Sequence, residues 1–150
     1  MTGNDRNFLE LSLDLLRQGY SIRFRPAGRS MFPTIKDGEA ICVAPISPRA
    51  IRRGDIILYR LARGVIAHRV LRSEEKSGVG RVFITRGDAS GSEDPPILPE
   101  EILGRVTAVE RAGKNISLAG RWPRWYYRVR VWASCAKGFC LTRQKPDTGQ

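Results

Sequence analysis

The chain has 150 residues, 41% of them hydrophobic, and a formal net charge of +11. This length and composition fit one folded domain with its own core, and they exclude a wholly disordered chain. No apolar run reaches the roughly 18 residues that span a bilayer, and the first residues lack the layout of a secretory signal. We therefore expect a cytoplasmic or peripheral membrane protein.

The positive charge is concentrated toward the C-terminus. Residues 105–150 have a charge balance of +8, whereas residues 1–104 carry only +3. Such a basic segment attracts anionic partners, either acidic lipid headgroups or nucleic acid. The three cysteines lack metal-ligand spacing, and His68 has no second histidine beside it. We therefore expect reduced thiols, no metal site and no cofactor.

The first predicted element is an amphipathic helix at residues 6–18, followed by Gly19 as a suitable stop. The residues expected on its apolar face are Phe8, Leu9, Leu11, Leu15 and Leu16, and those expected opposite are Glu10, Asp14 and Arg17. Leucines at positions 9, 11, 13 and 15 also alternate as in a strand, so the pattern leaves both structures open.

From residue 20 onward the pattern changes to short β-type runs separated by turns. The predicted strands are residues 21–25, 40–46, 55–60, 65–71, 81–85 and 105–110. Residues 62–64 form a turn that joins two of them into a hairpin. Because no helical pattern separates the strands, we expect a mainly β, antiparallel sheet or partial barrel.

Residues 120–145 contain all three tryptophans and two of the four tyrosines, interleaved with arginines. Amphipathic aromatic rings beside cations suit a membrane interface, and they equally suit stacking on nucleic-acid bases. A third interpretation is an edge strand or closing helix whose arginines are simply solvated. The sequence leaves these three interpretations open.

Ser30 lies in a segment, residues 28–35, that could present a nucleophile. A serine hydroxyl reacts only when a base removes its proton and backbone N–H groups stabilise the developing oxyanion. Gly28 permits a tight approach before the serine, and Pro33 stiffens the chain after it. Serines in turns are usually structural, so this segment alone decides nothing.

His68 and two acidic residues supply the other groups that such chemistry needs. The neutral imidazole of His68 can accept a proton near neutral pH, although a histidine in a strand is more often a half-exposed surface residue. Asp88 and Asp94 lie in a Gly/Ser-rich loop. Either carboxylate could fix the tautomer of the histidine, and either could simply form a turn.

Five blocks of the chain, taken in order, form a more specific pattern. They are Gly28-x-Ser30-Met31-x-Pro33-Thr34-Ile35-x-x-Gly38-Glu39, Arg53-Gly54-Asp55-Ile56-Ile57-x-Tyr59, Ala67-His68-Arg69-Val70, Thr85-Arg86-Gly87-Asp88 with Asp94 six residues on, and Ile102-Leu103-Gly104-Arg105-Val106. Over about residues 20–110 the chain resembles the signal peptidase I superfamily. The resemblance is to its Ser–His branch, which is typical of endoplasmic-reticulum and archaeal enzymes.

The resemblance implies a partly barrel-like sheet of the signal peptidase and LexA type, with the active site in a groove at its edge. It implies Ser30 as the nucleophile, His68 as the general base, Asp94 as the acid behind it and Asp88 as a supporting residue. It also implies the N–H of Ser30 as an oxyanion donor. The residues expected to shape the oxyanion hole and substrate groove are Gly28, Arg29, Met31 and Pro33.

Substrates of the family are peptides or preproteins bound as extended strands, with small residues before the cleaved bond. On this basis the chain divides into an N-terminal amphipathic helix (1–19), a peptidase domain (20–112) and a basic aromatic C-terminal segment (113–150). Preprotein-cutting members usually have a transmembrane helix before the serine block, where this chain has a short charged segment. The C-terminal segment could replace that anchor by lying on an anionic membrane surface.

The resemblance also has departures and alternatives. Ala89 and Ser90 stand where the family commonly has asparagines. The leading interpretation is a serine endopeptidase that cleaves an extended peptide segment. The alternatives are a catalytically degenerate peptide-binding domain and a LexA-like self-processing or regulatory domain. The LexA group uses a lysine base and a helix-turn-helix, neither of which the sequence indicates, so we do not expect a nucleic-acid partner.

Overall fold

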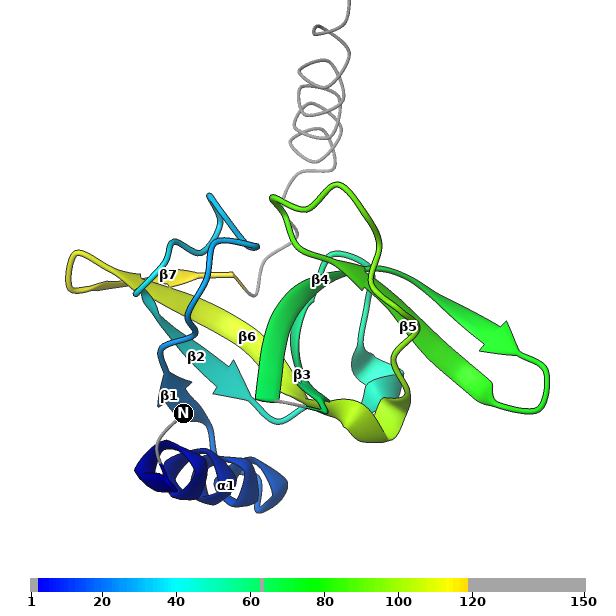
Figure 1. Cartoon of the computed structure of the whole chain (residues 1–150), viewed down its shortest axis with the longest axis horizontal. Helices are drawn as coiled ribbons and strands as arrows, with labels where there is room; N and C mark the ends of the chain where they lie inside the picture. Colours follow the sequence, from blue (N-terminus) through cyan, green and yellow to red (C-terminus); the bar gives the residue numbers. More distant parts are fainter. Residues whose placement is uncertain (1–2, 63, 119–150) are drawn as a thin grey trace, which may run out of the picture. The chain divides into compact units, whose positions relative to one another are not determined.

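The computed structural model describes residues 3–62 and 64–118 (Figure 1). It contains one antiparallel sheet of seven strands, so the expected mainly β, antiparallel fold is confirmed. The elements are α1 (Gly3–Arg17), β1 (Ile22–Phe24), β2 (Ala40–Ala44), η1 (Pro48–Ala50), β3 (Ile56–Leu61), β4 (Gly64–Lys76), β5 (Gly80–Arg86), η2 (Pro99–Glu101), β6 (Ile102–Arg111) and β7 (Lys114–Ser117), where η denotes a short 3-10 helix. The predicted aromatic segment at 120–145 lies outside the described residues.

The strand order is β1-β2-β6-β3-β4-β5, with β7 paired to β6. Within the described residues β1 and β5 do not pair with each other, so the sheet is not closed. Each of the six predicted strands is present, and β3 and β4 pair as the predicted hairpin. The sequence missed β7, which is exposed along its whole length and therefore lacks an apolar alternation. This strand continues the sheet past residue 112.

Helix α1 ends as its sequence predicts. The N–H of Tyr20 donates to the carbonyl of Leu15 (2.9 Å), and the N–H of Gly19 donates to that of Leu16 (3.0 Å). Gly19 has a φ of +94°, which a residue without a Cβ adopts at little cost. This Schellman arrangement satisfies the last carbonyls of the helix and turns the chain toward β1.

The predicted apolar face of α1 is partly wrong. Leu13 and Leu16 are buried, whereas Leu11 and Leu15 are exposed, and the side chains of Phe8 and Leu9 lie outside the described ones. Residues three or four positions apart share a helix face, so Leu13 and Leu16 form one side and Leu11 and Leu15 form another. Burial of the first pair against the sheet decides which side faces inward.

The sheet is buried on both faces at β3. Ile56 and Leu58 belong to one hydrophobic cluster, while Ile57 and Tyr59 belong to another, as expected for side chains that alternate along a strand. The first cluster also contains Leu13 and Leu16 of α1 and two residues of the β1–β2 connection, Met31 and Ile35. The core therefore fixes the connection that contains the predicted nucleophile.

Gly104 tests how tightly the middle of the sheet is packed. A Cβ at this position would lie 2.7 Å from the carbonyl oxygen of Ala44 and 2.7 Å from Cγ1 of Val43. We expect Gly104→Ala to lower the free energy of unfolding by about 1–3 kcal/mol, measured by urea denaturation. Gly91→Ala is the control, because a Cβ at Gly91 meets nothing within 4 Å. Equal stability of the two variants would contradict this packing.

Candidate active site

Ser30 lies in the connection between β1 and β2, which we call the Ser30 loop (residues 25–39). The N–H of Phe32 donates to the carbonyl of Arg29, and the N–H of Ile35 donates to that of Met31, each at 3.0 Å. Met31 and Ile35 are 5% and 3% exposed and anchor this turn in the core. Ser30 itself is half-buried at the surface. The side chain of Met31 therefore packs in the core beneath the loop, and its expected part in the substrate groove stays a prediction.

His68 lies on β4 opposite Ile57 of β3. Its Nε2 is 2.9 Å from Oγ of Ser30, and its Nδ1 is 2.6 Å from Oδ2 of Asp94. The residue is only 4% exposed, so the interpretation of a half-exposed surface histidine is wrong. The two ring nitrogens thus connect the serine hydroxyl to a carboxylate through one buried side chain.

Asp94 lies in the loop after β5 and is held there by Thr85. The N–H of Asp94 donates to the carbonyl of Thr85 (2.9 Å), and the hydroxyl of Thr85 donates to Oδ2 of Asp94 (2.7 Å). The phenol of Tyr59 donates to the same oxygen at 3.3 Å. With His68, three donors therefore converge on Oδ2, an arrangement that suits a negatively charged acceptor. Of the two candidate acids, Asp94 is the one that contacts His68.

Tyr59 is a persistent donor because of where it lies. It is 2% exposed, and its ring packs edge-on to that of His68 with 6.4 Å between centroids. Burial raises the pKa of Tyr59 to about 12, because the buried phenolate would lose its hydration, and the nearby charge of Asp94 acts in the same direction. The phenol therefore keeps its proton throughout the neutral range.

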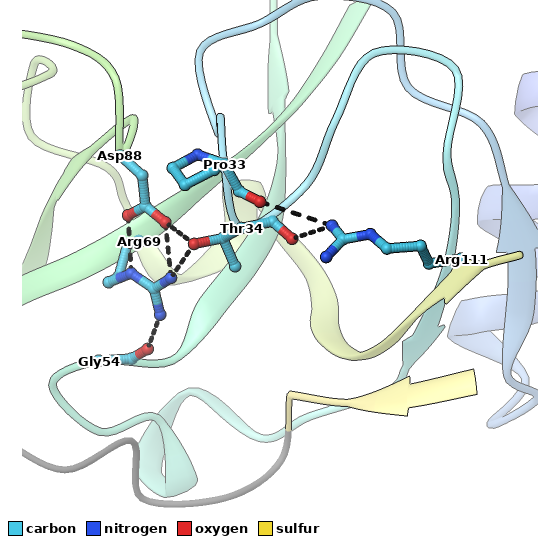
Figure 2. A network of polar contacts seen from close by, with 6 residues as sticks. All are labelled: Pro33, Thr34, Gly54, Arg69, Asp88 and Arg111. Carbon is cyan, nitrogen blue, oxygen red and sulfur yellow. Dashed lines mark hydrogen bonds and ion pairs between the residues drawn. The ribbon is translucent and has the colours of Figure 1, made fainter. Parts of the chain in front are cut away.

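Asp88 serves a different network, drawn in Figure 2. Nε and Nη2 of Arg69 donate to its two oxygens at 2.8 and 2.7 Å, and the hydroxyl of Thr34 donates to Oδ2 at 2.5 Å. Nη1 of Arg69 donates to the carbonyl of Gly54 at 2.8 Å. This ion pair, with side chains 7% and 12% exposed, ties the Ser30 loop to the loop after β5 and to the turn before β3.

Gly87 lets the loop after β5 approach Ser30 closely. A Cβ at Gly87 would lie 2.6 Å from the carbonyl oxygen of Ser30 and 2.7 Å from Oγ of Ser90. The N–H of Ala89 donates to that same carbonyl of Ser30 at 2.8 Å. The two loops therefore meet at the backbone of the serine itself, at a distance that only glycine permits.

The backbone amides near Ser30 differ in what they are able to bind. The N–H of Gly28 donates to Oδ1 of Asp37 at 2.9 Å and is therefore occupied. Among the described residues, none accepts a hydrogen bond from the N–H of Ser30. Arg29 is exposed beside it, and Pro33 is half-buried. Among the groups expected at an oxyanion hole, the amide of Gly28 is therefore occupied, whereas the amide of Ser30 donates to no acceptor within the described residues.

Sequence reasoning missed the residues that hold the catalytic candidates in place. Four of these residues belong to the five sequence blocks, but the blocks alone indicated no function for them. They are Tyr59, Thr85, Arg69 and Thr34. Arg111 lies outside every block, yet it contacts the Ser30 loop. No local pattern in the sequence would have pointed to it.

Elsewhere the described residues offer few competing sites. They contain no group of three or more His, Cys, Asp or Glu residues that could hold a metal ion, and none of their helices is long and apolar enough to cross a membrane. Cys42 is a half-buried free thiol. A cavity of about 590 Å³ lies between α1, the segment after β2 and the start of β6, away from Ser30, His68 and Asp94.

Chemically, the arrangement can pass a proton from a serine hydroxyl to an imidazole whose other nitrogen is held by a carboxylate. No family model matches the chain, and no curated protein matches it. The assignment of this chemistry to Ser30, His68 and Asp94 therefore depends on their geometry and on the ordered blocks around them.

The raised pKa of Tyr59 predicts a loss of stability at high pH. Its folded value of about 12 exceeds the ordinary 10.0, so the stabilisation is fully present below pH 10 and is lost as pH rises toward 12. We expect Tyr59→Phe to be less stable at neutral pH by about 1 kcal/mol and to lose stability less steeply above pH 10. Urea denaturation across this pH range measures both effects. Tyr20→Phe, at an exposed position, is expected to keep the wild-type profile.

Proposed function

We propose that this chain is a serine hydrolase in which Ser30 is the nucleophile and His68 is its general base. The observation that carries the proposal is the continuous series of hydrogen bonds from Oγ of Ser30 to Nε2 of His68 (2.9 Å) and from Nδ1 of His68 to Oδ2 of Asp94 (2.6 Å). A nucleophile within hydrogen-bond reach of a base, which a third group orients, is the arrangement that activates a serine.

Within this class, the proposal is a serine endopeptidase that resembles signal peptidase I of the Ser–His branch, with the corresponding peptidase fold. The antiparallel sheet is compatible with that fold. Support comes from the blocks, because the serine block, the histidine strand and the acid loop meet at one place. The proposed substrate is a peptide or preprotein segment bound in extended form, so that its backbone is accessible to Ser30.

The first step of the proposed reaction is acylation. Asp94 accepts the Nδ1–H of His68, which leaves the lone pair of Nε2 directed at the hydroxyl of Ser30. As Oγ bonds to the scissile carbonyl carbon, His68 takes the serine proton, and the carbonyl oxygen gains negative charge. In this proposal the N–H of Ser30 donates to that oxygen.

The second step releases both products. When the carbon–nitrogen bond breaks, His68 gives its proton to the leaving amine, and an ester remains on Ser30. A water molecule then attacks the ester while His68 takes one of its protons, and the proton returns to Oγ as the ester bond breaks. In both steps Asp94 stabilises the imidazolium, and the hydroxyls of Thr85 and Tyr59 hold the carboxylate in place.

The test is covalent labelling of the full chain with a fluorophosphonate probe, which needs no knowledge of the substrate. We expect the wild type to be labelled and Ser30→Ala to be unlabelled. His68→Gln should react about 10²–10⁴-fold more slowly because general-base assistance is lost. Ser90→Ala is the matched control, since Ser90 lies in the adjoining loop and has no role in the proton transfer.

Because His68 is buried, circular dichroism and thermal denaturation must show that each variant is folded. Labelling that persists in folded Ser30→Ala, or a wild type that does not react, would rule out the serine mechanism. Incubation of the wild-type protein, without the probe, with a peptide mixture then distinguishes the three proposed functions. New peptide termini support the endopeptidase, a shortened chain supports self-processing, and binding without cleavage supports a degenerate domain.

A further inference from the structure

Arg111, the last residue of β6, contacts the Ser30 loop at two places. Its Nε and Nη2 donate to the two carboxylate oxygens of Glu39 at 2.5 and 2.9 Å. Nη2 also donates to the carbonyl oxygen of Thr34 at 3.2 Å and lies 3.5 Å from that of Pro33. One guanidinium thus connects the middle of the loop to its end, directly before β2.

Figure 2 shows that Arg69 and Arg111 approach Thr34 from opposite sides. Nη2 of Arg69 lies 3.3 Å from the hydroxyl of Thr34, whereas Arg111 reaches its backbone carbonyl. Glu39 is itself tied to the loop, because the N–H of Lys36 donates to its Oε2 at 2.8 Å. The segment that follows Ser30 is therefore fixed by contacts to two different strands.

We propose that Arg111, together with Glu39, is a positioning pair that holds the Ser30 loop where Oγ of Ser30 meets Nε2 of His68. The inference rests on the proposed hydrolase function. Neither residue contacts Ser30, so the pair acts through the loop backbone and takes no part in proton transfer. Its effect is expected on the reactivity of the serine and not on the histidine–carboxylate contact.

The chemistry of the pair suits this role. The side chain of Glu39 is 13% exposed and that of Arg111 34% exposed, so water screens the interaction only in part. The hydrogen bond from Arg111 lowers the pKa of Glu39, which therefore stays charged. A planar guanidinium can serve the carboxylate and a carbonyl at once in a fixed geometry, which a lysine ammonium cannot.

A neighbouring ion pair provides a matched control. Arg23 of β1 donates to the carboxylate of Glu110, which precedes Arg111 on β6. It has the same chemistry and joins the same part of the sheet, but among the described residues its side chain pairs with Glu110 and not with the Ser30 loop. Arg23→Ala therefore removes an ion pair beside Arg111 and leaves the contacts to Thr34 and Glu39 in place.

The experiment measures the second-order rate of fluorophosphonate labelling for the full-length wild type, Arg111→Ala, Arg111→Lys, Glu39→Gln and Arg23→Ala. A misplacement of about 1 Å costs on the order of 10²-fold in rate. We expect labelling to slow by about 10- to 100-fold in Arg111→Ala and by less in Glu39→Gln, which keeps its shape. Arg111→Lys should not recover the wild-type rate, and Arg23→Ala should keep it.

Two further readouts separate positioning from general loosening. Added guanidinium ion is expected to restore part of the labelling rate of Arg111→Ala and to leave Arg23→Ala unchanged. Because His68 is the only histidine, the proton NMR signal of its Nδ1–H is readily identified. This signal should keep its wild-type position in Arg111→Ala, since the contact to Asp94 is retained.

The outcomes are distinguishable. Wild-type labelling rates in folded Arg111→Ala and Glu39→Gln would overturn the positioning role and leave the hydrolase proposal standing. A slower rate that guanidinium does not restore, accompanied by a shifted His68 signal, would also overturn it, because the fold as a whole would have loosened. If Arg111→Ala does not fold, Glu39→Gln and Arg111→Lys decide the matter. Failure of the wild type to label overturns both proposals.

Discussion

Arg69 and Asp88 form an ion pair whose side chains are 7% and 12% exposed, and three chain segments meet on it. Charges taken out of water lose their hydration, and a buried pair is tolerated only when each remaining polar position finds a partner. Here the hydroxyl of Thr34 and the carbonyl of Gly54 are two such partners. Because these partners come from separate loops, satisfying the charges also fixes the loops relative to one another. This requirement is one of the constraints that hold the Ser30 loop beside His68.

His68 and Arg69 are adjacent on β4 and have different roles in the candidate site. Side chains alternate across a strand, so His68 points to one face and Arg69 to the other. His68 takes part in the contacts with Ser30 and Asp94, whereas Arg69 holds the loops that contain them. A single rigid strand therefore supplies both the candidate base and its structural support. This coupling limits how far the serine and the histidine can drift apart.

Much of the fold could be predicted from the sequence, because strands and turns leave local signals in residue type and spacing. Spacing alone left Asp88 and Asp94 as alternatives, because both lie in the same loop. The resemblance implied Asp94, and the contacts of Thr85 and Tyr59 hold Asp94 against His68. The side of α1 that is buried depends on how the helix packs against the sheet, and the sequence of the helix alone does not determine that packing. Arg111 was missed for a related reason. Its partner Glu39 is 72 residues away, so no local sequence pattern predicts that the two residues pair.

In the proposed mechanism, the identity of the base explains the polar groups around Asp94. The neutral form of a histidine has two tautomers, and only the one with a lone pair on Nε2 can accept the serine proton. A fixed carboxylate at Nδ1 selects that tautomer. The donors from Thr85 and Tyr59 hold Asp94 in that position, and so these hydroxyls follow from the choice of histidine at position 68.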